Sequence, residues 1–565
     1  MAPSLIHRSN NPDISLPHDQ SFHQFITNYN PDDTPADKVI LEDLSLPRKT
    51  VTYGGLRRTA SIIAAGLTSK YGLRKGDSVA IIAANSVNWA VAAHSIIWFG
   101  GIANLALVFA VPSGTNHLAT EYELEHYLKH AAPSLVLVDQ DSQAKTERAL
   151  RSLTIRGKPI PVLVFDGSNP ETSFPACAAP GQKPIPPLEL SRQHSHEVPA
   201  CVLFSSGTTG KPKAVVLSHY NLIAHIWIYR VGGSFFNNGR MIEVFFPPFA
   251  HMLGLLGAVL GTAFWGSHVL IMKRFVYQEF IKACSERRAT IMKVVPSVVV
   301  MIAKDPDVKH LDLTSLQYVV SSSAALQNEV VTTINQIMGG VDIIQGYGMS
   351  ETAVSIVHPA QSATKAGSIG RLHANVRLRI VDDQMKDVPI GTPGEALVKS
   401  PFVFMHYRDS PQATKEMFHD GWLRTGDVLS IDEDGHLWYH DRKKEIIKYK
   451  GNQVAPAELE GVLQSHEAVV DAAVTSIWDE SQRTDLPIGY VCLDPAVKQE
   501  HRQAVLEDVQ TYFNTRVSAY KRLRGGLHYL DSMPKNATGK TMRNLLPARL
   551  DAAADAARIK TFVRL

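Results

Sequence analysis

The chain has 565 residues, which at about 150 residues per domain is enough for three to four compact units. Lysine and arginine total 57 against 54 aspartates and glutamates, and a net charge of only +3 does not indicate a nucleic-acid partner. With 45% hydrophobic and 20% charged residues, the composition is that of a globular protein and excludes the disordered and fibrous classes.

The N-terminal segment interrupts its only apolar stretch with His7 and Arg8, so it lacks the hydrophobic segment of a signal peptide. Four cysteines occur singly along the chain, without a CxxC pair or a zinc-like spacing. This pattern is typical of reduced thiols rather than of a secreted disulfide scaffold, so we expect a cytoplasmic protein. Peroxisomal import is the alternative, because residues 563–565 (Val-Arg-Leu) partly match the Ser-Lys-Leu import signal.

Residues 51–140 alternate helical and strand patterns, which is typical of an α/β fold. No charged residue occurs between Asp77 and Glu121, a run long enough to cross a bilayer. Polar residues, Pro112 and Gly114 interrupt the run, which favours a buried strand, helix and strand instead. A second uncharged run, residues 252–272, contains four glycines and is predicted to be a tightly packed core helix. The sequence therefore predicts no membrane span.

Two domains are expected from the change of pattern along the chain. Residues 166–200 contain seven prolines and few apolar runs, which indicates a surface crossover between two lobes. Residues 201–440 resume the α/β pattern and end in short strands around the Asp434-Gly435 turn. After residue 440 a charged strand, two helices and further strands follow. We expect a large, multi-lobed domain over residues 1–440 and a small α+β domain over residues 441–565.

A glycine-rich loop carries the strongest local pattern. It lies between two apolar strand patterns and ends at Lys213. Converging backbone N–H groups, hydroxyls and a lysine suit a polyphosphate, although the spacing is not that of a Walker loop. A solvated hairpin rich in turn residues is the alternative. The predicted phosphate ligands are Ser205, Ser206, Gly207, Thr208, Thr209, Gly210 and Lys213.

With this loop, five further motifs follow in order and make the chain resemble the adenylate-forming superfamily of acyl-CoA synthetases, 4-coumarate–CoA ligases and beetle luciferases. The resemblance covers nearly the whole chain and implies a mobile C-terminal domain. The motifs are PPFAHMLG at 247–254, GYGMSET at 346–352, WLRTGD at 422–427, DRKKEIIKYKGNQVAPAELE at 441–460 and PKNATGK at 534–540.

The nucleotide site follows from these motifs. Tyr347 offers a ring for stacking on adenine, and Ser350 offers a hydroxyl for the α-phosphate. Glu351 supplies an oxygen ligand for Mg²⁺, which typically takes one or two carboxylates plus substrate phosphates. Asp427 can accept hydrogen bonds from two ribose hydroxyls. Arg442 contacts the ribose or a phosphate, unless it forms a surface salt bridge with Asp441 or Glu445 instead. The resemblance adds Ala324, Gly346 and Gly348 to the ATP and AMP site.

Lys540 is the predicted catalytic lysine. An ammonium between the attacking carboxylate and the α-phosphate would offset the repulsion between two anions. The resemblance implies a hinge at Lys444, about which the small domain rotates between the two half-reactions. Rotation would withdraw Lys540, bring Lys448 and Gln453 to the adenylate, and place Gly451 along the pantetheine channel of CoA.

His251 lies among apolar residues, and the resemblance implies that it gates the channel between carboxylate and thiol. We interpret it as a gate and not as a general base. The region from Phe246 to Trp265 has no acidic residue, which disfavours an α-amino acid substrate. Ser322 stands where the family commonly has glycine, so hydroxycinnamates are not assigned. The predicted acyl pocket is mostly apolar and consists of Met252, Leu256, Val298, Met301, Ser322 and Ser323.

These residues predict an ATP-dependent acid–thiol ligase that adenylates an aryl or alkyl carboxylic acid and transfers the acyl group to CoA. ATP, Mg²⁺ and CoA are the expected cofactor and co-substrates, and a monomer or homodimer is expected. Two alternatives stay open. The acyl acceptor could be the phosphopantetheine thiol of a carrier protein, or the chain could be a nucleotide-binding regulator without turnover.

Overall fold

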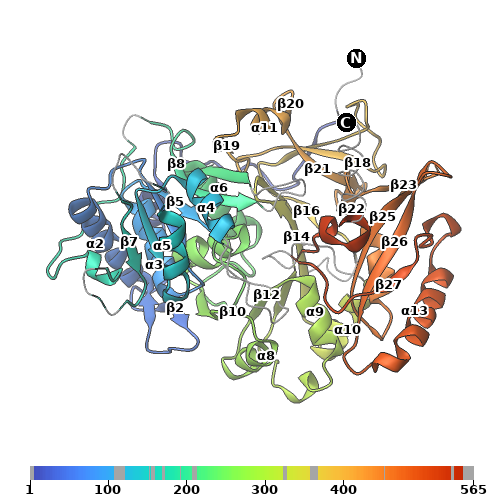
Figure 1. Cartoon of the computed structure of the whole chain (residues 1–565). Coiled ribbons are helices and arrows are strands. Elements are labelled where there is room, and N and C mark those ends of the chain that lie inside the picture. The colour runs from blue at the N-terminus through green and yellow to red at the C-terminus, as the bar shows by residue number, and fades with distance from the viewer. Residues whose placement is uncertain are drawn as a thin grey trace, which may run out of the picture.

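The computed structural model has the α/β architecture that the alternating patterns predict (Figure 1). Three large sheets form most of the molecule, and a small sheet with α13 (Arg502–Arg516) lies at one end. No helix among the described residues is long and apolar enough to cross a bilayer. The structure describes residues 5–106, 121–151, 153, 159–167, 169, 172–190, 193–205, 213–321, 328–356, 365, 367–450, 452–535 and 540–550.

The first large sheet contains the uncharged region after Asp77. A strand, a helix and a strand form there, as predicted, because the sheet is parallel at this point and buried on both faces. Its helices are α2 (Tyr53–Tyr71), α3 (Val87–Trp98), α4 (Glu121–Ala131) and α5 (Gln140–Leu150). Its strands lie in the order β19 (His406–Tyr407), β9 (Lys213–Ser218), β8 (Pro199–Ser205), β5 (Ile102–Leu105), β4 (Ser78–Ile82), β6 (Leu135–Val138) and β7 (Val162–Val164).

The second large sheet has a parallel centre and antiparallel edges. Its strands are β16 (Arg371–Leu372), β15 (Thr352–Ile356), β14 (Asp342–Met349), β13 (Tyr318–Ser321), β12 (Ile291–Val294), β10 (Ile242–Phe245), β11 (His268–Ile271), β2 (Val39–Asp43) and β3 (Thr50–Thr52). The helices of this region are α1 (Phe22–Asn28), α6 (His219–Gly232), α8 (Tyr277–Glu286), α9 (Pro296–Lys304) and α10 (Asn328–Ile337).

The third large sheet leads into the C-terminal unit. Its strands are β1 (His7–Arg8), β17 (Arg377–Val381), β18 (Gly394–Lys399), β21 (Trp422–Ile431), β20 (Phe418–His419) and β22 (Leu437–Arg442), with α11 (Pro411–Glu416) beside them. The C-terminal unit has a hydrophobic core of its own. The predicted boundary after residue 440 falls inside β22, and the division into two domains stays a prediction. The C-terminal elements are β23 (Ile447–Tyr449), β24 (Asn452–Val454), α12 (Pro456–Gln464), β25 (Val469–Asp479), β26 (Thr484–Leu493), α13 and β27 (Leu527–Tyr529).

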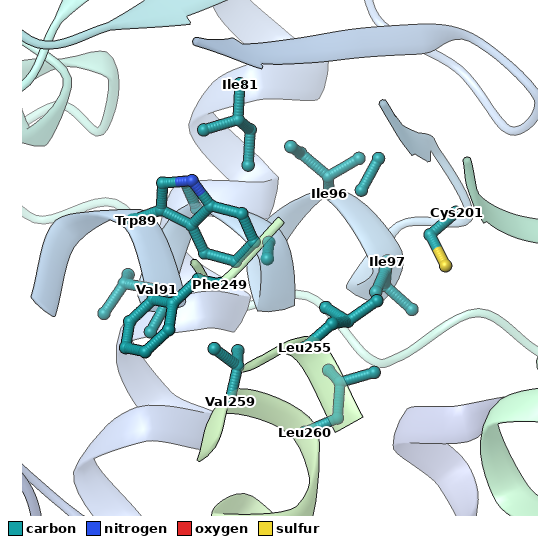
Figure 2. Close-up of a cluster of buried hydrophobic side chains, with 14 of the residues drawn as sticks. Ile81, Trp89, Val91, Ile96, Ile97, Cys201, Phe249, Leu255, Val259 and Leu260 are labelled. Atoms are coloured by element: carbon teal, nitrogen blue, oxygen red, sulfur yellow. The ribbon is translucent and has the colours of Figure 1, made fainter. Parts of the chain in front are cut away.

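The second uncharged run does not form the single core helix that the sequence predicts. It forms a π-helix, η2 (Leu253–Gly261), a short α7 (Thr262–Trp265) and strand β11. Figure 2 shows Leu255, Val259 and Leu260 of η2 gathered against the side chains of α3, which hold one face of the π-helix in the core. The opposite face, with Met252, Leu256 and Gly257, is only partly buried. Such π-turns occur frequently at functional sites.

One ammonium joins the C-terminal unit to the second sheet region. Lys304, the last residue of α9, donates hydrogen bonds to the carbonyls of His466 (3.4 Å), Glu467 (3.3 Å) and Val469 (2.5 Å), just beyond α12. This contact fixes one orientation of the C-terminal unit, in which the unit lies beside α9 (Figure 1).

The family resemblance predicts that the orientation with Lys540 near the acids is the one that forms the adenylate. On that prediction, replacing Lys304 by methionine is expected to slow adenylate formation about 2- to 5-fold, because a partly exposed charged contact contributes up to about 1 kcal/mol. Thioester formation from supplied acyl-adenylate should be unchanged or faster, since the variant would lose a contact of the predicted adenylating orientation only. Stopped-flow measurement of each half-reaction checks this, with Lys309→Met as a nearby lysine control. Equal slowing of both half-reactions would contradict the assignment.

Candidate functional site

The hairpin of β14 and β15 brings the GYGMSET residues to the end of the second sheet. The ladder shifts register between Tyr347 and Gly348. A side chain at Gly348 would meet the Thr352 carbonyl at 3.0 Å, so the close approach of the two strands favours glycine here. Gly346 and Ser350 are half-buried on the same hairpin. The turn therefore presents a phenol, a hydroxyl and the carboxylate of Glu351 within five residues.

Asp427 and Arg442 face each other across the hairpin of β21 and β22. Asp427 is 7% exposed, and it accepts a 2.6 Å hydrogen bond from the Tyr347 hydroxyl. The Arg442 Nε lies 3.8 Å from its other carboxylate oxygen. Burial raises the pKa of Asp427, and Arg442 and Tyr347 oppose the rise. Arg442 thus faces two carboxylates, Asp427 at 3.8 Å and Glu445 at 4.0 Å.

Glu351 is the second buried acid of the site, with 5% exposure. One of its oxygens accepts a 2.6 Å hydrogen bond from the Tyr407 hydroxyl. The Lys213 ammonium lies 4.9 Å from the Tyr407 ring centre. Burial raises the pKa of Glu351, while Tyr407 and Lys213 favour its charged form. Lys213 begins β9, so the charge at the end of the glycine-rich loop acts on this carboxylate.

Lys540 reaches the two acids from the C-terminal unit. Burial and, to a smaller extent, the nearby Arg442 lower the pKa of Lys540 to about 8, whereas Asp427, Glu351 and Glu445 act in the opposite direction. The charge of Lys540 also acts on His251, whose pKa is lowered to about 4, chiefly by burial. His251 is therefore neutral near pH 7. The ammonium lies among two carboxylates, a guanidinium and an imidazole.

The segment that carries Lys540 is anchored on both sides. Before it, the Lys535 ammonium contacts Asp471 of β25 at 2.6 Å. After it, Arg543 pairs with Glu460 of α12 at 2.7 Å and also with Glu445. These contacts fix the position of Lys540 relative to the C-terminal core, so a rotation of that unit would carry the ammonium with it.

The residues predicted for thioester formation lie on the hairpin of β23 and β24, where Lys448 and Gln453 are paired. Lys448 and the predicted hinge residue Lys444 are exposed. The hydrogen bond from Lys443 and, to a smaller extent, the charge of Lys448 lower the pKa of the Asp383 carboxyl. Lys448 is thus exposed beside Asp383, whereas Lys540 is partly buried near the two acids of the site.

The predicted acyl residues lie on two elements. His251 and Met252 lead into η2, which carries Leu256. On α9, Met301 is half-buried, whereas Val298 is fully buried in the hydrophobic core of the second sheet. Ser205 ends β8. The remaining predicted residues lie outside the described residues, and their roles stay predictions: Ser206, Gly207, Thr208, Thr209, Gly210, Ser322, Ser323, Ala324 and Gly451.

One residue of the site escaped the sequence reasoning. Tyr407 lies between motifs in the two-residue strand β19, and nothing in the local sequence links it to Glu351. Glu445, one of the two salt-bridge partners that the sequence offered for Arg442, approaches its guanidinium at 4.0 Å.

Comparisons with known proteins agree with this geometry. The sequence model of the AMP-binding enzyme family matches residues 29–408, and that of the AMP-binding enzyme C-terminal domain matches residues 458–540. The chain is 31% identical to 4-coumarate–CoA ligase-like 1 of Arabidopsis thaliana, over 88% of this chain and 89% of that protein. It is 30% identical to 4-coumarate–CoA ligase 3 of the same plant, over 96% and 94%.

Solved structures with the same fold include the anthranilate CoA ligase AuaEII in complex with anthranoyl-AMP, with a TM-score of 0.82 and 25% identity over 95% of this chain and 99% of that one. ATP-bound MatB from Rhodopseudomonas palustris has a TM-score of 0.78 and 23% identity, over 94% and 98%.

Proposed function

The chain belongs to the AMP-binding enzyme family of adenylate-forming, acyl-CoA ligase-like enzymes, and from that premise we propose that it is an ATP-dependent ligase joining an aryl or alkyl carboxylic acid to CoA. The observation that carries the proposal is that Lys540 is partly buried where the charges of Asp427 and Glu351 act on it. A regulator without turnover would have no need to retain a cation together with both acids.

In the first step, a substrate carboxylate oxygen attacks the α-phosphorus of ATP, the bond to the bridging oxygen breaks, and pyrophosphate leaves. Lys540 offsets the charge that accumulates between the two anions. Asp427 holds the ribose hydroxyls, Tyr347 stacks on adenine, and Lys213 with the glycine-rich loop holds the phosphates. Positioning and charge neutralisation supply most of the catalysis, as in other phosphoryl transfers.

Glu351 fits the Mg²⁺ ligand that this chemistry implies. Tyr407 hydrogen-bonds one carboxylate oxygen and thereby orients the group. A single buried carboxylate matches an ion that takes one or two carboxylates and completes its shell with substrate phosphates and water. When bound there, Mg²⁺ would offset phosphate charge, and the role of Glu351 would be to fix its place beside the nucleotide.

In the second step, the CoA sulfur attacks the acyl carbonyl, a thioester forms, and AMP leaves with the mixed-anhydride oxygen. The C-terminal unit turns about Lys444, which withdraws Lys540 and presents Lys448 and Gln453. His251 moves aside as the gate for the thiol. The low pKa of His251 means that a neutral imidazole serves as the gate. The CoA thiol needs no dedicated base, because a thiol with a pKa of about 8.5 is already partly ionised near neutral pH.

The direct test uses the purified full chain, ATP and Mg²⁺ with a panel of aryl and alkyl acids. Pyrophosphate release followed by mass detection of acyl-CoA is the expected result. Product that appears only with a phosphopantetheinylated carrier protein would favour carrier loading instead. Nucleotide binding without pyrophosphate release for any acid would favour the regulator and overturn the proposal.

The pH dependence of adenylation should follow the charge of Lys540. Its pKa is lowered to about 8, so the ammonium is present below that pH and is lost as the pH rises through it. We expect kcat/KM for pyrophosphate release to fall above about pH 8. His251, with a pKa of about 4, does not titrate in this range. In Lys540→Arg the guanidinium stays charged over this pH range. We expect this variant to be less active, but its kcat/KM for pyrophosphate release should not fall above about pH 8. A fall at the same pH as in the wild-type chain would contradict the assignment.

A further inference from the structure

The π-helix η2 depends on contacts with the elements around it. It runs over nine residues, whereas π-turns in proteins are mostly single turns within an α-helix. Its hydrogen bonds join residues five apart, and an α-helix with bonds four apart would use the same carbonyls. Because the α-helix is by far the commoner conformation, we expect a neighbouring group to favour the π form.

Gly261 permits the π form at the end of η2. A β-carbon at this position would lie 2.5 Å from the carbonyl oxygen of Leu256, five residues earlier, and would also overlap the Trp265 ring. The missing side chain removes this clash. It does not select the π-helix, because a glycine can also be part of an α-helix. A contact that selects the π form has to come from another element.

Helices α2 and α3 donate hydrogen bonds to carbonyls of this segment. The imidazole of His94, on α3, has its Nε2 3.3 Å from the Val259 carbonyl oxygen of η2. The Tyr53 hydroxyl, on α2, donates to the Phe264 carbonyl of α7 at 3.1 Å. A side chain that inserts into the hydrogen-bond ladder of an α-helix distorts it. His94 is therefore placed to act on η2 itself.

A second histidine fixes which nitrogen of His94 carries the proton. Burial lowers the pKa of His94 to about 4 and lowers the pKa of His23 well below its usual value, so both rings are neutral near pH 7. The Val259 carbonyl can only accept, so Nε2 of His94 is the donor and its Nδ1 is an acceptor. His23, on α1, has its Nε2 3.0 Å from this Nδ1 and donates to it.

This assignment also suits the last nitrogen of the pair. Nδ1 of His23 has no partner among the described residues, and in this arrangement it is an acceptor. Buried acceptors lack partners more often than buried N–H groups do. His23 and His94 are each 1% exposed. The two rings therefore form a directed chain of hydrogen bonds that ends on η2.

Holding the core side of η2 sets the position of its other side. Leu255 and Val259 pack toward α3 (Figure 2), whereas Met252 and Leu256 lie on the partly buried face that is predicted to line the acyl pocket. A π-helix is wider than an α-helix, because its bonds span five residues instead of four. If η2 relaxed to an α-helix with its core side still on α3, the opposite face would recede. The predicted pocket would then be larger.

We propose that His94, oriented by His23, holds η2 in the wide π form and thereby limits the size of the carboxylic acid that the ligase accepts. His94 acts through η2, so it is a positioning residue and not a catalytic one. It lies outside the sequence motifs of the site. The inference rests on the ligase function proposed above and adds a determinant of substrate size to it.

The test measures how the full chain discriminates between acids of one type and different size: hexanoic and decanoic acid, and benzoic and 4-butylbenzoic acid. ATP–pyrophosphate exchange gives kcat/KM for each acid. In His94→Leu, the ratio of kcat/KM for the larger acid to that for the smaller one should rise about 10-fold or more in at least one pair, since space for one methylene changes discrimination by about 10- to 200-fold. The KM for ATP should stay within about 2-fold of wild type.

Two further variants separate this role from a general loss of stability. His94→Gln should keep the wild-type ratio within about 2-fold, because its amide can donate to the Val259 carbonyl and accept from His23. His225→Leu is the matched control: this buried imidazole of α6 packs against Phe402, and its loss should leave the ratio unchanged. Hydrogen–deuterium exchange over residues 253–265 should be faster in His94→Leu than in His225→Leu.

The ratio within one variant is independent of the fraction of folded enzyme. An unchanged ratio in His94→Leu, or a shift toward the smaller acid, would overturn the inference although acids are activated. An equal shift in His225→Leu, or exchange no faster in His94→Leu than in that control, would overturn it as well. His23→Leu should shift the ratio in the same direction and takes the place of His94→Leu if that variant does not fold. If no acid supports exchange in the wild-type chain, the ligase proposal itself fails and the inference fails with it.

Discussion

Lys540→Ala is expected to slow adenylate formation by about 10²–10³-fold, the usual loss when one preorganised charge-stabilising group is removed. The reason is electrostatic. Two anions must meet in a site that already holds Asp427 and Glu351, and Lys540 is the cation that the C-terminal unit adds there. Conversion of supplied acyl-adenylate and CoA to thioester should stay within about 3-fold of wild type, far below the loss in the first step.

Measuring the two half-reactions separately makes this result decisive. Lys448→Ala should show the reverse pattern, because Lys448 is exposed in this orientation and is assigned to the second step. Lys521→Ala serves as the matched control: this lysine of the C-terminal unit pairs with Glu458 at 2.6 Å, away from the site. If Lys540→Ala slowed both half-reactions equally, the rotation of the C-terminal unit between two orientations would have to be abandoned.

Asp427→Asn is expected to lower kcat/KM for ATP by about 10²-fold, since each hydrogen bond to a charged group contributes about 1.5–3 kcal/mol and two ribose hydroxyls are involved. Asparagine keeps the shape of the side chain but removes the charge that Arg442 faces at 3.8 Å. The affinity for the carboxylic acid should change little, because the acid does not reach the ribose.

Deoxynucleotides separate a ribose contact from a structural role. With 2′-deoxy-ATP or 3′-deoxy-ATP, the kcat/KM of the wild-type chain should fall about 10-fold per missing hydroxyl. The kcat/KM of Asp427→Asn should be almost the same with ATP and with either deoxynucleotide. This non-additivity is the expected result of a direct interaction. Tyr347→Phe is the control, since it removes only the hydroxyl that donates to Asp427. Additive losses, together with a lower melting temperature in Asp427→Asn, would make Asp427 a purely structural residue.

The sequence predicts the α/β fold well where burial leaves a clear pattern. The uncharged run after Asp77 is read correctly as strand, helix and strand, because polar residues break it at the right spacing. The prediction of a single core helix over residues 252–272 is wrong, because no charged residue there marks the breaks between elements. The apolar residues of this run are continuous, so their periodicity does not distinguish a core α-helix from a π-helix followed by a short helix and a strand.

The nucleotide-site residues could be predicted because each lies in a short sequence motif whose residue types indicate phosphate, ribose or metal binding. The motifs GYGMSET, WLRTGD and PKNATGK contain Glu351, Asp427 and Lys540. That these three groups lie together was implied by the family resemblance. Their mutual effects, such as the lowering of the pKa of Lys540 to about 8, depend on burial and on distances between elements remote in the sequence.

What the sequence by itself determined is the family, the fold class and the residue types that hold a nucleotide, because motifs and alternating patterns are local. What the tertiary structure alone decided is which buried charged groups lie beside η2. Residues 246–265 contain no acid, yet β10 and β12 bring the ion pair of Glu243 and Lys293 close to Gly257. Parallel strands place side chains from distant segments on one face, and a pairing made across a sheet leaves no trace in the spacing along the chain.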